Sequence, residues 1–114
     1  MTDRIYSFVG LAMKAGKLVS GEVNCEKALK NGKAFFVIVT ADASGNTKKK
    51  FENACKYRDI PFSVFGAKEM LGRLLGKETR SVAAVTDVQF AGKLMGLVAD
   101  QQSYGKIHGG ELIE

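Results

Sequence analysis

The sequence predicts an α/β fold, a three-layer α/β/α sandwich with about four strands in a mostly parallel or mixed sheet and five helices. One-sided helical patterns alternate with short apolar strands along the 114 residues, and such alternation places helices on both faces of a sheet. Residues 34–40 are apolar at nearly every position, which is typical of a central strand covered on both faces. We expect one domain over residues 1–100, followed by a loosely ordered tail over residues 101–114.

The first half of the chain supplies two helices and the central strand. Amphipathic spacing predicts a helix over residues 3–15, whose inward positions are Ile5, Phe8, Val9, Ala12 and Met13. Residues 17–20 are long enough only for a very short strand. Residues 21–31 predict a second helix bounded by Gly21 and Gly32, with an inward face of Cys25, Ala28 and Leu29. The central strand follows directly.

The second half alternates helix and strand twice more. After a turn at residues 42–46 we expect a helix that ends near Tyr57 and buries Thr47, Phe51, Ala54 and Cys55. Residues 61–65 predict a strand, and the fourth helix, after Gly66, is expected to bury Ala67, Met70, Leu71, Leu74 and Leu75. The last strand is expected at residues 81–85, before a fifth helix that buries Val88, Ala91, Leu94, Met95 and Val98.

The fifth helix carries a start signal of its own. Thr86 and Gln89 have the three-residue spacing of a capping box. We therefore expect the Thr86 hydroxyl to cap the helix and Gln89 to reach back toward it.

The charge of the chain indicates an anionic partner. The formal net charge is +5, and a basic surface attracts either nucleic acid or a membrane face. The same charge can also serve solubility alone. No apolar run approaches the roughly 18 residues of a membrane span, and the first residues enter an amphipathic pattern without a signal peptide. We expect a cytoplasmic protein that does not contact a membrane.

The two cysteines, Cys25 and Cys55, lie far apart and form no Cys-x-x-Cys pair. They are expected to be small buried residues of a protein in a reducing compartment. Apolar residues make up 46% of the chain, so a core can form without a metal ion or a disulfide.

An enzyme is the least favoured class. The single histidine, His108, lies between glycines in the tail and has no nearby catalytic partner in the sequence. Residues 76–79, Gly-Lys-Glu-Thr, superficially resemble part of a phosphate-binding loop, but they follow a helix instead of preceding one. No metal-ligand spacing is present. We therefore expect no catalysis, no cofactor and no metal ion.

The start of the helix at residues 21–31 is the best candidate binding site. The first turn of a helix carries unpartnered N–H groups and the positive end of the helix dipole. Gly21 lets another backbone approach closely, and Lys27 lies one turn further along. Other cations can extend or flank this surface: Lys30, Lys33, Lys77, Arg80 and residues 48–50. The other reading is that these lysines are simply solvated, and that Val23 is a lone exposed valine.

Several ordered pieces of the sequence resemble one family. There are four such pieces in order along the chain. They are Gly21 with Lys27-Ala28-Leu29, residues 35–44 with Asn46-Thr47, Ile60-Pro61-Phe62, and Leu71-Gly72 with Gly76-Lys77. Over about residues 3–98 the chain resembles the ribosomal L-seven-Ae/L-thirty-e superfamily, most closely its small bacterial YlxQ-type members. The resemblance implies an α/β/α sandwich that binds kink-turn or related RNA. It also implies that a Gly-x-Asn-Glu-x-x-Lys motif opens the second helix and reads tandem G·A pairs. The loop before the last strand is implied to cover a flipped-out base.

The chain departs from this pattern at two positions of the motif. Val23 occupies the Asn position and Asn24 the Glu position, so that only Gly21 and Lys27 match. Asn24 can still donate and accept hydrogen bonds, whereas Val23 cannot. Loss of one base-directed contact costs on the order of 1–3 kcal/mol. The covering loop, residues 77–80, is more polar than is usual in the family.

The resulting hypothesis is a non-catalytic RNA-binding protein of the ribosomal-protein type. Its expected partner is structured RNA, either ribosomal RNA or another kink-turn-like RNA, and association with the ribosome is expected. The oligomeric state is left open. The expected RNA-binding residues are Gly21, Glu22, Val23, Asn24, Lys27, Lys30, Lys77, Glu78, Thr79 and Arg80. The alternative is a protein-interaction module that keeps the fold but has lost specific RNA binding.

Overall fold

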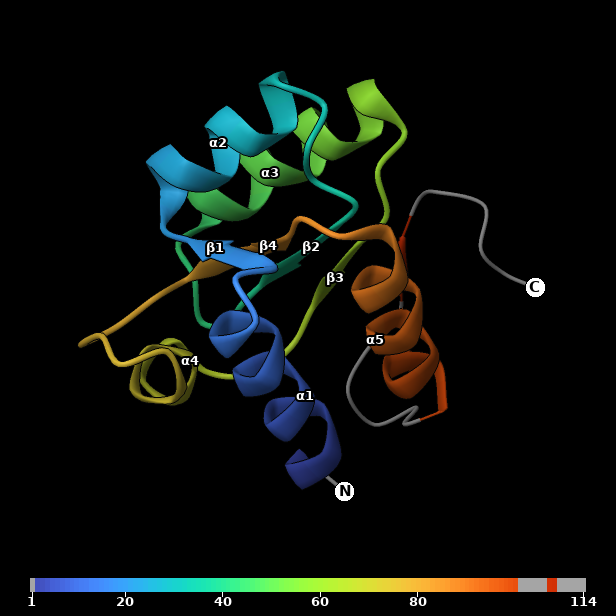
Figure 1. Cartoon of the computed structure of the whole chain (residues 1–114). Helices are drawn as coiled ribbons and strands as arrows, with labels where there is room; N and C mark the ends of the chain where they lie inside the picture. The colour runs from blue at the N-terminus through green and yellow to red at the C-terminus, as the bar shows by residue number, and fades with distance from the viewer. Residues whose placement is uncertain (1, 101–106, 109–114) are drawn as a thin grey trace.

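The computed structural model describes residues 2–100 and 107–108, and its elements alternate as expected (Figure 1). The elements are α1 (Thr2–Lys14), β1 (Leu18–Ser20), α2 (Glu22–Lys30), β2 (Phe36–Val39), α3 (Gly45–Arg58), β3 (Phe62–Val64), α4 (Lys68–Leu74), β4 (Val82–Val85), α5 (Val88–Asp100) and β5 (Ile107–His108). None of the helices in this described part is long and apolar enough to cross a membrane.

The sheet is mixed, with strand order β1-β4-β2-β3-β5. Of the two arrangements expected, the mixed one is correct, because only the β2–β3 pair is parallel among the strands of the described chain. β4 enters between β1 and β2 antiparallel to both, with Val85 opposite Leu18 and Phe36. As a result, β4 starts at the edge of the sheet where β1 and β2 end.

The helices form two layers, one on each face of the sheet (Figure 1). α2 and α3 cover one face and α1, α4 and α5 the other, which confirms the three-layer sandwich. Successive side chains of the central strand β2 point to opposite faces of the sheet. Phe36 and Ile38 pack with α1, α4 and α5, whereas Val37 and Val39 pack with α2 and α3. All four of these side chains are at most 1% exposed.

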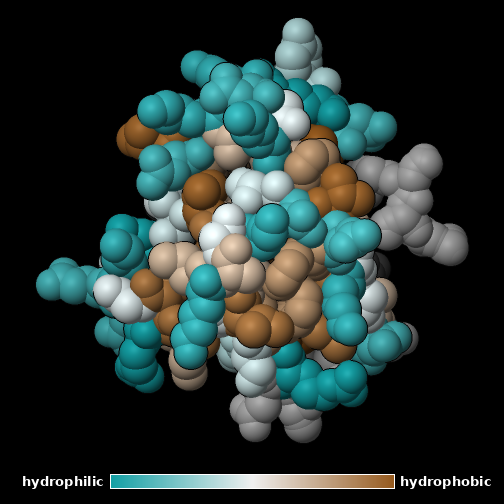
Figure 2. Space-filling view, viewed as in Figure 1, coloured by the Kyte–Doolittle hydropathy of each residue, from teal (hydrophilic) through white to brown (hydrophobic). Residues whose placement is uncertain are grey.

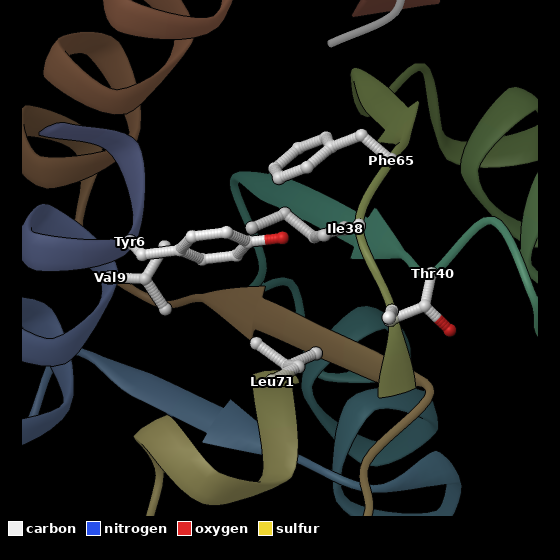
Figure 3. Close-up of a pocket in the computed structure, with 8 residues that line it drawn as sticks. Tyr6, Val9, Ile38, Thr40, Phe65 and Leu71 are labelled. Carbon is white, nitrogen blue, oxygen red and sulfur yellow. The ribbon is translucent and has the colours of Figure 1, made fainter. Parts of the chain in front are cut away.

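The layer of α1, α4 and α5 is closely packed where α1 meets the sheet. Figure 3 shows Tyr6 and Val9 of α1 facing Ile38, Phe65 and Leu71, and the Tyr6 and Phe65 ring centroids are 6.5 Å apart. The gap between these residues has no room for a water molecule. This part of the interior therefore serves packing and offers no space to a small-molecule ligand.

Three expected details of the helices were wrong. Ala67, Met70 and Val88 were expected to be buried, but Met70 is 40% and Val88 62% exposed, and Ala67 is exposed as well. α4 has only seven residues, so its buried stripe is limited to about one turn. Val88 is the first residue of α5 and lies beyond the packed part of that helix.

The cap of α5 is Asp87, not Thr86 as expected. The Phe90 N–H donates to Asp87 Oδ2 at 3.0 Å. Thr86 is still held by the sheet, because its N–H donates to the Lys17 carbonyl at 2.8 Å. The helix can therefore begin only one residue later.

Residues 107–108 lie in the segment that was expected to be a loose tail. They form β5, which pairs with β3 so that Ser63 lies opposite Ile107 and Phe62 opposite His108. The remainder of that tail, residues 101–106 and 109–114, lies outside the described residues.

Candidate nucleic-acid interface

Three connecting segments meet at one edge of the sheet. β1 ends at Ser20 beside the start of β4, where the Gly21 N–H donates to the Val82 carbonyl at 3.0 Å. β2 ends beside the same segment, where the Thr40 N–H donates to the Ser81 carbonyl at 2.8 Å. The start of α2, the turn before α3 and the loop before β4 are therefore neighbours in space.

The start of α2 has no side-chain cap. Gly21 is the N-cap residue, with φ 92° and ψ 153°, a conformation that disfavours any residue with a Cβ. Because glycine has no side chain to accept from the first turn, the N–H groups there can receive a ligand. Val23, in that same turn, is 70% exposed.

Arg80 lies directly against this helix start. Its Nε donates to Ser20 Oγ at 3.1 Å and its Nη1 donates to the Thr79 carbonyl at 2.9 Å. A Cβ added to Gly21 would lie 3.7 Å from the same Nε. A fixed guanidinium thus lies next to the uncapped N–H groups, which makes this corner suited to an anion.

The loop that carries Arg80 is positioned by α4. The Lys77 N–H donates to the Gly72 carbonyl at 2.7 Å, and the Arg80 N–H donates to the Lys68 carbonyl at 3.1 Å. Gly72 allows the loop to pass very close, because a Cβ there would meet the Glu78 carbonyl oxygen and Thr79 Cα at 2.6 Å. The side chains of residues 77–79 are exposed.

Glu22 is occupied by contacts to α3. The Thr47 hydroxyl donates to its Oε2 at 2.9 Å, and Lys50 Nζ lies 3.2 Å from its Oε1. Lys50 also pairs with Glu26 at 3.1 Å. The hydrogen bonds from Thr47 and then Lys50 lower the pKa of Glu22, so it is a carboxylate at neutral pH. Both oxygens of Glu22 therefore hold α2 against α3.

The neighbouring turns supply further caps. Ser44 Oγ accepts from the Thr47 N–H at 3.1 Å and begins α3. Asp42 Oδ1 accepts from the Lys68 N–H at 3.0 Å and so caps α4 from a distant loop. These contacts fix the edge of the sheet around the α2 start without using Arg80 or Lys27.

Asn24 and Lys27 lie on the side of α2 that faces away from α3. Asn24 Nδ2 donates to the Ser20 carbonyl at 3.2 Å. Both residues line a hollow of about 430 Å³ whose other walls are Val19, Ala28, Lys33, Phe35 and Thr86. Lys30 is in the last turn of α2, about 12 Å along the helix from Glu22 at 1.5 Å per residue.

The structure thus brings together part of the expected set. Gly21, Asn24 and Arg80 converge around Ser20, whereas Lys30 and the side chains of residues 77–79 show no contact with them among the described residues. Ser20 was not expected to be part of the site. Its hydroxyl orients Arg80 across 60 positions of sequence, and no local pattern reveals such a partner.

No metal centre is formed by the described residues, which contain no group of three or more His, Cys, Asp or Glu side chains suitably placed. Both cysteine thiols are buried and free. Burial raises the pKa of Cys25 and of Cys55 to about 12. They are therefore protonated core residues and do not serve as nucleophiles at neutral pH.

Sequence comparison identifies the family. The model of the ribosomal protein L7Ae/L30e/S12e/Gadd45 family matches residues 3–95. The chain belongs to this family. It is 44% identical over 93 residues to "RNA-binding protein YlxQ" of Bacillus subtilis, a match that covers 82% of this chain and 93% of that protein. A protein of the same name from Enterococcus faecium is 40% identical over 97 residues, covering 84% and 92% of the two chains.

Solved structures agree with this assignment. A Bacillus halodurans protein described as having unknown function matches with a TM-score of 0.80 and 41% identity, covering 83% of this chain and 96% of that one. The Giardia lamblia 15.5kD RNA binding protein matches with a TM-score of 0.70 over 88% of this chain and 85% of its own. At 21% identity, the second match shows that the fold is shared. The resemblance seen in the sequence is thereby confirmed.

Proposed function

We propose that this chain binds structured RNA at the start of α2 and acts without catalysis. The observation that carries the proposal is the fixed Arg80 guanidinium beside the uncapped helix start at Gly21. Backbone N–H groups and a guanidinium both recognise phosphate oxygens. Family membership and two relatives named as RNA-binding proteins support RNA as the anion.

The side chains at and near this corner make different contacts with the RNA. Arg80 at the corner and the exposed Lys27 and Lys30 further along α2 contact phosphates, because their charges are opposite to those of phosphate oxygens. The exposed Val23 packs on a sugar or base, and the exposed loop at residues 77–79 covers the RNA from the side. Glu22 acts as a positioning residue, since both its oxygens already hold Thr47 and Lys50.

Kink-turn or kink-turn-like RNA is the proposed target, with reduced selectivity. Val23 offers no hydrogen bond to a base, and one amide hydrogen of Asn24 is already donated to the Ser20 carbonyl. The Asn24 oxygen and the second amide hydrogen are left for a base edge. Loss of one base-directed contact lowers discrimination by about 1–3 kcal/mol. The proposed RNA is ribosomal RNA in the cytoplasm, and the proposed assembly that contains it is the ribosome.

Binding of three RNAs across a salt series tests the function. A kink-turn RNA, a plain duplex and a scrambled hairpin are compared by fluorescence anisotropy. The expected result is tighter binding of the kink-turn RNA, with affinity falling steeply as salt rises because phosphates are neutralised. Equal binding of all three RNAs would contradict the proposal that kink-turn RNA is the target. If none of the three RNAs binds at low salt, the RNA-binding proposal is wrong, and the alternative of a protein-interaction module on the same fold is favoured.

Variants that remove or reverse a charge locate the site on the surface. Arg80→Ala and Lys27→Glu are expected to weaken binding of the kink-turn RNA at least tenfold, since each removes a charge-assisted contact. Lys93→Glu is the matched control, because Lys93 is an exposed residue of α5 in the opposite helix layer. If Lys93→Glu weakens binding as much as Lys27→Glu, the RNA does not bind at the α2 start.

A further inference from the structure

The hollow beside α2 begins at Asn24, which also contacts Ser20 at the Arg80 corner, and extends away from that corner. Its floor and far wall come from residues that flank the other ends of the strands: Phe35 precedes β2 and Thr86 follows β4, whereas Arg80 precedes β4. At about 3.3 Å per strand residue, residues 80 and 86 lie roughly 20 Å apart. Figure 2 shows this face of the molecule, with hydrophilic residues over α2 and paler and brown residues below them over β1.

The hollow is positively charged. Lys27 and Lys33 line it, and neither is in an ion pair among the described residues, whose pairs involve Lys17, Lys50 and Lys56. The nearest acidic groups in sequence are already engaged, Glu26 with Lys50 and Asp87 with Lys17. An anionic group that enters the hollow therefore meets two uncompensated ammonium groups.

The walls of the hollow also offer an apolar surface on which a planar ring can pack. Phe35, Val19 and Ala28 form this apolar surface. The Phe35 backbone is fixed because its N–H donates to the Val85 carbonyl at 2.8 Å, and its side chain is partly buried against the core. The Asn24 amide and the Thr86 hydroxyl add polar groups at the rim. The volume of about 430 Å³ lies in the range of small-molecule sites. A phosphate alone would leave the apolar wall in contact with water.

We propose that this hollow holds one unpaired nucleotide of the bound RNA. Its base packs against Phe35 and its phosphate lies between Lys27 and Lys33, so that the RNA strand runs from the α2 start along the side of the helix. The inference rests on the proposed RNA-binding function. It adds a second contact, in the hollow that extends from Asn24 to Phe35 and Thr86, and it identifies a nucleotide as the group bound there.

The test combines protein variants with changes in the RNA. The probe is the kink-turn RNA, together with copies in which each unpaired nucleotide is replaced in turn by an abasic residue. The variants are Lys33→Glu and Phe35→Leu, the latter keeping an apolar side chain of similar size at a partly buried position. Lys93→Glu is again the charge-matched control, and unfolding in denaturant verifies that each variant is folded.

The proposal makes two linked predictions. Lys33→Glu is expected to weaken binding about tenfold, and Phe35→Leu about fivefold through loss of stacking. One abasic position is expected to weaken binding of the unaltered protein by a similar factor but to have little further effect on Phe35→Leu, because both changes remove the same contact. Ultraviolet crosslinking of the unaltered protein is expected to attach RNA to the peptide that contains Phe35.

The possible failures are distinguishable. If Arg80→Ala weakens binding and Lys33→Glu does not, the hollow is not part of the RNA site, although the proposed function stands. If Lys33→Glu weakens binding but no abasic position is coupled to Phe35→Leu and no crosslink forms there, the hollow contacts a phosphate alone and the nucleotide proposal is wrong. If neither Arg80→Ala nor Lys33→Glu changes affinity, the proposed function fails as well.

Discussion

Substitution of Gly72 by alanine is expected to move the loop that carries Arg80. A Cβ at this position would lie 2.6 Å from the Glu78 carbonyl oxygen and from Thr79 Cα, and ordinary contact begins near 3.4 Å, so the loop must retreat by about 0.8 Å. The neighbours are backbone atoms that cannot rotate away. Overpacking of this kind costs about 1–3 kcal/mol, against a gain of about 1 kcal/mol in helix propensity.

Gly92→Ala is the matched control for this change. Gly92 is also inside a helix, and a Cβ there would meet nothing within 4 Å. The propensity gain is therefore common to both variants, and the difference between their free energies of unfolding should be the overpacking cost of about 1–3 kcal/mol. Urea unfolding of the two variants measures it. RNA affinity should fall only in Gly72→Ala, since only there is Arg80 displaced from Ser20. Equal stabilities and affinities for the two variants would refute the reasoning.

Three further predictions concern other parts of the structure. Glu22→Gln removes a carboxylate whose pKa lies below its ordinary value of 4.5. The unaltered protein should therefore be more stable than the variant above about pH 5 and should lose this advantage as the pH falls through the lowered pKa. Urea unfolding at neutral pH and near pH 3 measures the difference. A constant difference at both pH values would exclude the Glu22 contacts as its source. Asp87→Ala should destabilise the protein by about 0.5–2 kcal/mol through loss of the α5 cap, and Thr86→Ala by clearly less; the opposite order in thermal unfolding would show that Thr86 is the cap. The buried Cys25 and Cys55, with pKa values of about 12, should resist alkylation at pH 8 until the protein is unfolded, whereas rapid labelling of the folded protein would contradict their burial.

The two-layer core could be predicted because alternation along a strand is local. The run around Phe36 and Val37 is apolar at successive positions, which requires cover on both faces of the sheet. Cys25, Ala28 and Leu29 were likewise correctly expected to be buried, since their spacing on one helix face is independent of distant contacts. Such features depend on periodicity alone.

Other features depend on partners that periodicity does not specify. Thr86 and Asp87 are both good capping residues, and the choice between them is made by the hydrogen bond from Thr86 to Lys17 in the sheet. Glu22 was grouped with the expected RNA contacts because it opens α2, but its oxygens meet Thr47 and Lys50, more than twenty positions away. The antiparallel entry of β4 is another long-range choice. Phe35 was expected only as part of a central strand covered on both faces, and the fold shows that it also lines the hollow.

The hydrogen bond between Arg80 and Ser20 has a consequence for synthesis of the chain. The two residues are 60 positions apart, and β1 is held in the sheet by β4. During translation, α2 leaves the ribosome well before the strand and the arginine that complete its surroundings. Contacts of such long sequence separation form late, because the intervening loop must first be closed. We therefore expect the growing chain to gain affinity for RNA only after β4 has emerged from the ribosome.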